Sequence, residues 1–197
     1  MELGRTAREH TSFVTARLRS IPVAGSDRVC KFGITRFRAT LGAMKANERE
    51  SLIKRYREGH RAVMDALRGV SDAELDRSAS GEWTPRQIAH HLADSEMMSA
   101  MRLRRLITEE SPVIHGYDEV GFATKLTSDR PIAPSLEAMR YARESTAQIL
   151  DRLSETDWKR TGTHTESGPY SVETWLTTYA AHGHDHAAQI KRSRGIE

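Results

Sequence analysis

Cysteine is almost absent from this chain of 197 residues, which has a single one, Cys30. One thiol excludes a disulfide bond within the chain, and a reducing cytoplasm is the simplest compartment for such a protein. From Met44 onward the sequence contains no cysteine at all. Any sulfur chemistry in that part of the chain would therefore need a thiol supplied from outside.

Long apolar runs are missing as well. Arg, Glu or His interrupts every apolar segment before it reaches the roughly 18 to 20 residues that a membrane-spanning helix requires. The N-terminal region also lacks the apolar core of a signal peptide. Because 38% of the residues are hydrophobic, the chain can still form a core. We therefore expect a soluble globular protein with no membrane partner.

The formal net charge of +3 is unevenly distributed along the chain. Residues 1–43 hold eight basic and three acidic residues, a net of +5, whereas the remainder holds 22 basic and 24 acidic residues, a net of −2. A nucleic-acid-binding surface normally concentrates cations on the folded domain itself. We therefore expect no nucleic-acid partner.

The first 43 residues differ from the rest in pattern as well as in charge. They show no sustained hydrophobic period, and a helix-like run opens at Met44. Two interpretations are open: residues 1–43 are a mobile basic arm, or the start codon is placed too early and Met44 is the biological first residue. We favour the second. The predicted organisation is an N-terminal extension, 1–43, followed by one domain, 44–197.

Four segments of that domain have the hydrophobic period of amphipathic helices: 47–69, 84–108, 135–153 and 172–193. The clearest begins with Thr84 as the N-cap residue and Pro85 in the first helical position. Between the second and third segments, three prolines and two glycines predict a long connection with at most short helical pieces. Residues 161–171 read as a loop or a small hairpin. The fold class predicted is an all-α four-helix bundle with one long crossover connection.

Three histidines lie close together in the fourth segment, and helical geometry separates them. At about 100° per residue, His182 and His186 fall within about 20° of Trp175, on the apolar face. His184 falls on the opposite side and should face solvent. Two inward histidines one turn apart can bind one divalent metal ion.

The second segment carries two adjacent histidines, and the same geometry distinguishes them. His91 lies about 60° from Ile88, at the edge of the buried face, whereas His90 faces away from it. If the second and fourth helices are neighbours, His91, His182 and His186 would supply three neutral nitrogen donors. Three protein ligands leave coordination positions open for water or substrate, which is the pattern of a catalytic site.

Each of these histidines also has a simpler interpretation. An inward histidine by itself is more often a hydrogen-bonded core residue, but a pair at i, i+4 with a third on another helix favours a metal site. Gly183 follows the first histidine of the pair, so this is not the HExxH motif of metalloproteases. Asp94 and Glu96 lie to either side of the predicted face, which favours solvated positions or hydrogen bonds to the ligands over ligation. His60 is predicted to be a packing residue, and His115 and His164, on predicted loops, to be surface residues.

Three stretches together resemble the DinB-like superfamily, most closely its YfiT-like branch: "WTPRQIAHHLADSE" (83–96), "ESPVIHGYDE" (110–119) and "YAAHGHDHAAQI" (179–190). The resemblance covers about 44–194 and leaves residues 1–43 outside. It implies a four-helix bundle with a divalent metal ion, nickel or zinc, and matches the family's three metal-binding histidines to His91, His182 and His186. These are the residues that the helical geometry selects.

The resemblance also implies what such a protein does. Members are often described as metal-dependent hydrolases and are often homodimers, and several related proteins are transferases or isomerases that depend on bacillithiol, mycothiol or a similar thiol. Our leading hypothesis is a cytoplasmic, metal-dependent enzyme that transfers a low-molecular-weight thiol to a small electrophilic substrate. The alternatives are a hydrolase that activates water, and a stress-related metal-binding protein without catalysis.

Overall fold

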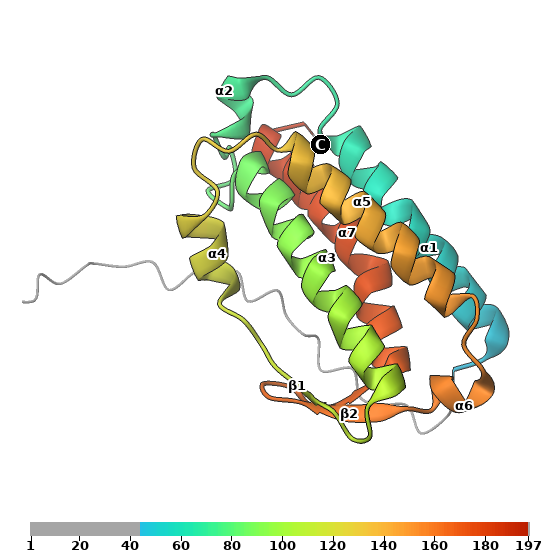
Figure 1. Cartoon of the computed structure of the whole chain (residues 1–197). Coiled ribbons are helices and arrows are strands. Elements are labelled where there is room, and N and C mark those ends of the chain that lie inside the picture. The colour runs from blue at the N-terminus through green and yellow to red at the C-terminus, as the bar shows by residue number, and fades with distance from the viewer. Residues whose placement is uncertain (1–43, 197) are drawn as a thin grey trace, which may run out of the picture. The chain divides into compact units, whose positions relative to one another are not determined.

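A computed structural model describes residues 44–196 of the chain. The predicted extension, 1–43, lies outside the described residues, so both interpretations of it stay predictions. Four long helices dominate the described part: α1 (Ala46–Ala66), α3 (Pro85–Thr108), α5 (Ala133–Leu150) and α7 (Val172–Arg194). Three short ones accompany them: α2 (Asp72–Leu75), α4 (Glu119–Lys125) and α6 (Glu155–Trp158). The predicted four-helix bundle is confirmed (Figure 1).

The order of the helices around the bundle differs from their order in the chain. α1 packs against α5 and α7, and α3 packs against the same two helices, so α1 and α3 occupy opposite corners. In Figure 1, α3 and α5 run in one direction while α1 and α7 run in the other. Because α3 and α5 are parallel, the chain must return along the bundle between them. This explains the long crossover connection that contains α4.

Local sequence signals set where these helices begin and end. The Thr84 hydroxyl accepts a hydrogen bond from the backbone N–H of Gln87, whose side chain bonds back to the backbone of Thr84, a capping box at the start of α3. Ser171 caps α7 in a similar way, through the backbone N–H of Thr174. At its other end, α7 stops at Gly195, which has a left-handed conformation with φ of 69°.

A small sheet closes one end of the bundle. β2 (Thr161–His164) and β3 (Gly168–Ser171) form the antiparallel hairpin that the sequence allowed, and β1 (Val113–Ile114) adds a parallel strand that it did not predict. Val113 pairs with Thr163, and Thr161 pairs with Ser171. The sheet thereby attaches the start of the crossover connection to the beginning of α7.

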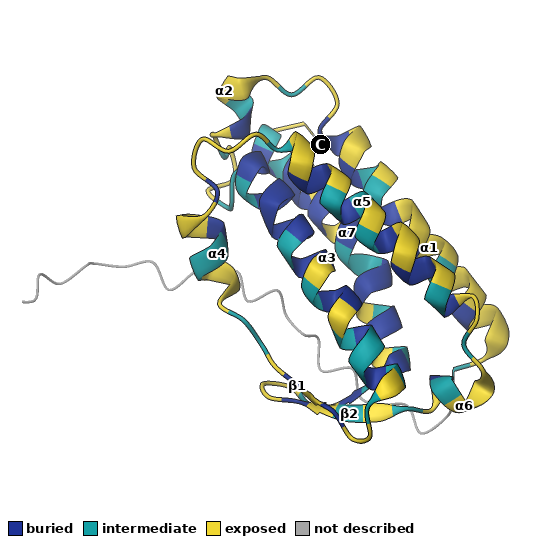
Figure 2. Cartoon of the chain, viewed as in Figure 1, coloured by how far each residue is buried: buried dark blue, intermediate teal, exposed yellow. Residues whose placement is uncertain are grey.

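The core is divided along the bundle axis. One apolar cluster surrounds Trp175 and Leu103, and a second surrounds Ile88 and Ile190. Figure 2 shows the buried residues on the inward faces of the four long helices. Within residues 44–196, no helix has both the length and the apolar character needed to cross a bilayer.

Candidate metal centre

His182 and His186 lie one turn apart on the inward side of α7. Their Nε2 atoms are 3.1 Å apart, and their ring centroids are 4.5 Å apart. Two nitrogen ligands on one tetrahedral zinc ion, with bonds of about 2.0–2.1 Å, would lie about 3.3 Å from each other. The spacing of the two imidazoles therefore already suits a shared ion.

His91 approaches this pair from α3. Its ring centroid lies 4.7 Å from that of His186 and 5.4 Å from that of His182. Each of the three residues offers a nitrogen atom, and these atoms all lie within 4.8 Å of one another. The structure thus brings together the three histidines that the sequence selected, because α3 and α7 are neighbours in the bundle.

All three rings are held in the neutral form that binds metal ions. Burial, followed by the charge of His186, lowers the pKa of His91 to about 3. Burial also lowers the pKa of His186 to about 4, and that of His182 well below its ordinary value. At neutral pH the site therefore presents unprotonated nitrogen atoms without competition from protons.

Two further observations fit a ligand at this place. His91 and His182 each have a buried Nδ1 atom without a hydrogen-bond partner among the described residues, which is uncommon for buried polar atoms. Nδ1 of His186 lies 2.7 Å from Oε1 of Gln189. With Gln189 accepting, the proton sits on Nδ1 and the Nε2 lone pair is left for a metal ion, the usual orientation of a metal-binding histidine.

The glycine between the histidines of α7 has a packing role that the sequence analysis missed. A Cβ atom on Gly183 would lie 3.0 Å from Cα and 3.1 Å from the carbonyl carbon and oxygen of Gly59 on α1. α1 and α7 therefore approach each other more closely here than a larger residue would permit. The sequence did contain a signal for this contact, because a glycine inside a helical pattern often marks a close approach between helices.

A buried ion pair crosses the bundle beside the histidines and corrects the prediction for Glu96. Its side chain is fully buried, and its Oε2 accepts a hydrogen bond of 2.7 Å from Nε of Arg143 on α5. The hydroxyl of Tyr56 on α1 donates to the other carboxylate oxygen. Arg143 also donates to the backbone carbonyls of Tyr56 and, at 3.1 Å, of Tyr179 on α7. All four long helices meet in this network. Glu96 was predicted to be solvated or hydrogen-bonded to the metal-binding histidines, but its carboxylate is used by Arg143 and Tyr56 instead.

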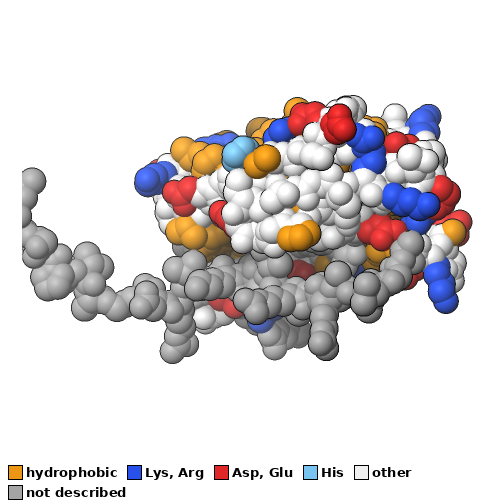
Figure 3. All heavy atoms as spheres, turned by 90° about the horizontal axis from the view of Figure 1, so that it is seen from below, with side chains coloured by type: hydrophobic (Ala, Val, Ile, Leu, Met, Phe, Trp, Pro, Cys, Tyr) orange, Lys and Arg blue, Asp and Glu red, His pale blue; other side chains and the backbone are white. Residues whose placement is uncertain are grey.

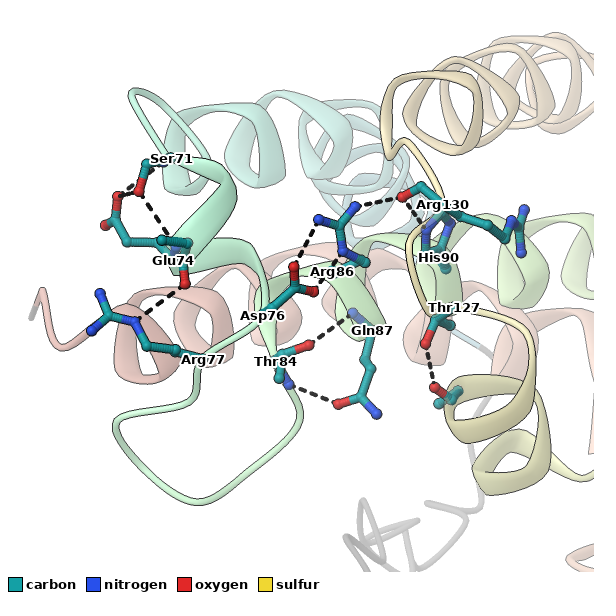
Figure 4. A network of polar contacts seen from close by, with 12 residues as sticks. Ser71, Glu74, Asp76, Arg77, Thr84, Arg86, Gln87, His90, Thr127 and Arg130 are labelled. Atoms are coloured by element: carbon teal, nitrogen blue, oxygen red, sulfur yellow. Dashed lines mark hydrogen bonds and ion pairs between the residues drawn. The ribbon is translucent and has the colours of Figure 1, made fainter.

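The neighbouring histidines stay out of the site, although their surroundings differ from the predictions. His90 faces away from the cluster but is buried, and its Nδ1 lies 2.8 Å from the Ser135 hydroxyl. Its Nε2 lies 3.3 Å from the Arg130 carbonyl oxygen (Figure 4). The crossover connection and the start of α5 cover it, which a single helix cannot reveal. His184 is half-buried instead of fully exposed, and its Nε2 lies 3.0 Å from the Arg55 carbonyl oxygen on α1.

Of the remaining predictions, one on the small sheet fails. His164 belongs to β2 and is buried, with its ring 5.5 Å from that of Tyr170, because the sheet packs against the bundle. His115 is exposed and His60 is half-buried, as expected. Asp94 is half-buried, and burial raises the pKa of its carboxyl group. It is the acidic residue nearest to His91 along α3, and it forms no ion pair within the described part of the chain, although the charge of Arg130 partly offsets the effect of burial.

Comparisons with known proteins identify the family of this chain. A model of the DinB superfamily matches residues 55–190, which include the three histidines. A protein of Oceanobacillus iheyensis named "Putative metal-dependent hydrolase" is 40% identical over 131 residues, 66% of this chain and 76% of that protein. A protein of Halalkalibacterium halodurans with the same descriptive name is 31% identical over 63% of this chain and 73% of its own length. This chain belongs to the DinB superfamily.

A solved structure supports the same assignment. YfiT from Bacillus subtilis, described as "a probable metal-dependent hydrolase with an unusual four-helix bundle topology", matches with a TM-score of 0.74 and 27% sequence identity. The match covers 80% of this chain and 94% of that one.

Proposed function

We propose that His91, His182 and His186 hold one divalent metal ion, nickel or zinc, at the centre of an enzyme active site. The observation that carries this proposal is the convergence of three neutral imidazoles, two buried and that of His182 half-buried, whose donor atoms lie within 4.8 Å of one another. The names of the relatives support metal dependence. When bound, such an ion lowers the pKa of a coordinated thiol or water molecule and so supplies a nucleophile at neutral pH.

Our proposed reaction is transfer of a low-molecular-weight thiol to a small electrophilic substrate. Among residues 44–196, no Asp or Glu joins the three histidines closely enough to belong to the same donor group. A hydrolase usually needs a carboxylate near its activated water to accept a proton, whereas a thiol, with an ordinary pKa of about 8.5, is readily deprotonated. The three histidines can therefore bind and orient a nucleophile but include no carboxylate to accept a proton, which favours a thiol, the nucleophile that needs such help least.

Hydrolysis is the second candidate, and the names of the relatives favour it. Among residues 44–196, Asp94 is the candidate to accept a proton in that reaction, because it is half-buried on α3 one turn after His91. We further propose that the protein acts in the cytoplasm as a homodimer.

Metal analysis of the purified full-length protein tests the first part of the proposal. We expect one ion per chain in the wild type and loss of the ion in His91→Ala and His182→Ala. His184→Ala is the matched control, since it removes a histidine from the same helix outside the cluster. Retention of metal by His91→Ala and His182→Ala would refute the proposed site, as would equal loss from the control.

The reaction is tested by incubating the metal-loaded protein with thiols and a chlorinated nitrobenzene. We expect consumption of thiol and electrophile that disappears in His182→Ala. If the protein instead hydrolyses esters or amides without a thiol, hydrolysis replaces transfer as the function. If neither activity is found, metal binding without catalysis remains.

A further inference from the structure

Arg102 lies on the same side of α3 as His91. The two residues are eleven positions apart, which places them within about 20° of each other around the helix and about 16 Å apart along it. Side chains on a helix lean toward its N-terminus, so a long side chain at position 102 reaches back toward His91. Its Nη1 atom donates a hydrogen bond of 2.9 Å to the hydroxyl of Tyr179 on α7.

Tyr179 connects Arg102 to the histidine cluster. It precedes His182 by three positions on α7, and the centroids of their rings are 5.7 Å apart. The guanidinium group is therefore separated from the cluster by about one tyrosine side chain and one hydrogen bond. A small molecule with its reacting group at the histidines could reach Arg102 with its other end.

The guanidinium group has no carboxylate partner within ion-pair distance among residues 44–196. By contrast, Arg49, Arg86 and Arg143, the buried arginines of the described chain, each form an ion pair. The other direct contacts of Arg102 are neutral: the carbonyl oxygen of His115, 2.8 Å from Nη2, and the ring of Tyr117, whose centroid is 5.9 Å away. The carboxylate of Glu119, at the start of α4, attracts the guanidinium group without forming an ion pair with it.

Part of the donor capacity of Arg102 is also unused. Its Nε atom is buried and has no acceptor among the described residues. The other end of the side chain is accessible, because the residue as a whole is half-buried and the hydrogen bond from Nη2 lies at the surface. A partly buried cation with spare donors is usually compensated by an anion. Among the described residues, only attraction at longer range from the Glu119 carboxylate compensates it, and the Nε donor has no acceptor, so a ligand is expected to supply the paired anion.

We propose that Arg102 is a binding residue for a carboxylate group on a substrate of the metal site. The planar fork of arginine matches a carboxylate in shape and donates two parallel hydrogen bonds to it, and the single positive charge balances a single negative one. Anchoring the molecule at Arg102 orients its reacting group toward the histidines. The inference rests on the proposed function for the position of the reacting group, but it concerns a separate contact. The carboxylate could belong to the thiol or to the electrophile.

Binding measurements on two matched pairs of compounds test the inference. Glutathione is compared with its diethyl ester, and 4-chloro-3-nitrobenzoate with its methyl ester, by calorimetric titration of full-length protein with and without bound Ni²⁺. We expect the wild type to bind the acid of at least one pair about 10-fold more tightly than the ester, as a charged hydrogen-bonded contact provides. The pair that shows this preference identifies the molecule that carries the carboxylate.

Two variants and a control assign the preference to Arg102. Arg102→Met should remove the preference for the acid while leaving ester binding and the metal content unchanged. Arg102→Lys keeps the charge without the planar fork and should give an intermediate preference. Arg104→Met is the matched control, because Arg104 is also half-buried without a carboxylate partner but donates to Ser145 and Thr146 on α5. It should keep the wild-type preference.

The outcomes separate this inference from the proposed function. If neither acid is preferred by the wild type, or if Arg102→Met keeps the preference, the carboxylate site is refuted, whatever the metal content. If the preference depends on Arg102 but no ion binds, the carboxylate site stands and the metal proposal fails. Should Arg102→Met not fold, the comparison of Arg102→Lys with Arg104→Met decides.

Discussion

The ion pair between Glu96 and Arg143 should be among the most sensitive points of the bundle. Both side chains are almost fully withdrawn from solvent, with exposed fractions of 0% and 3%. Glu96→Gln removes the negative charge but nearly keeps the shape, so it leaves the buried guanidinium group with two carbonyl acceptors and no counter-charge. Breaking a buried pair in this way destabilises a protein by about 3–5 kcal/mol. A domain of this size has a total stability of about 5–15 kcal/mol, so the loss should be large.

Urea denaturation followed by circular dichroism measures this loss. With a denaturant dependence of about 2 kcal/mol/M, a loss of about 4 kcal/mol lowers the midpoint by about 2 M. Glu137→Gln is the control, because Glu137 pairs with Arg140 at the surface of α5 and its removal should not shift the midpoint measurably.

A double-mutant cycle completes the test. Arg143→Met alone leaves the Glu96 carboxylate buried and should also destabilise, whereas the double variant removes both charges and should lose much less than the sum of the two single losses. If Glu96→Gln unfolds at the same urea concentration as Glu137→Gln, or if the losses simply add, the two charges do not stabilise each other as the geometry requires.

Three further predictions follow from individual contacts. Gly183→Ala should destabilise the metal-free protein by about 1–2 kcal/mol in urea denaturation, because overpacking against Gly59 costs about 1–3 kcal/mol and the better helix propensity of alanine offsets part of that loss; an unchanged or higher midpoint would contradict the close contact. Gln189→Ala should weaken metal binding about 10- to 100-fold in a competition with a chelator, since it removes the acceptor that orients a histidine ligand; equal affinity would argue against that orientation. Burial, and then the charge of Arg102, lower the pKa of His164 in the folded protein. In the unfolded chain this histidine has its ordinary pKa of about 6.5, so below that pH the unfolded chain binds a proton that the folded protein does not. The protein should lose stability as the pH falls from 7 to 5, and His164→Gln should reduce this loss; an NMR titration showing an ordinary or raised pKa would refute the reasoning.

Much of the bundle could be predicted from the sequence, because hydrophobic periodicity and capping residues act locally. Thr84, Pro85 and Ser171 mark helix starts through bonds made within a single turn. The same local geometry places His182 and His186 on one face of α7. The parallel strand Val113–Ile114 could not be found in this way, because its partner lies about fifty residues further along the chain.

The surroundings of individual residues could not be predicted from the sequence, because they depend on the tertiary structure. Helical geometry correctly turned His90 away from the cluster but could not show that the crossover connection and Ser135 bury it. The same limit applies to Glu96: its position on α3 is local information, whereas its partner Arg143 lies on another helix.

The amino-acid sequence alone specified four amphipathic helices, the inward positions of three histidines and a chain without cysteine from Met44 onward. These properties depend on residue type and on spacing within one helix, both of which are fixed before the chain folds. Three properties could be known only from the folded structure: α3 lies beside α7, Gly59 and Gly183 bring α1 close to α7, and Arg102 donates a hydrogen bond to Tyr179 on another helix. Such properties depend on contacts between distant segments, which form only when the helices pack together around a shared core.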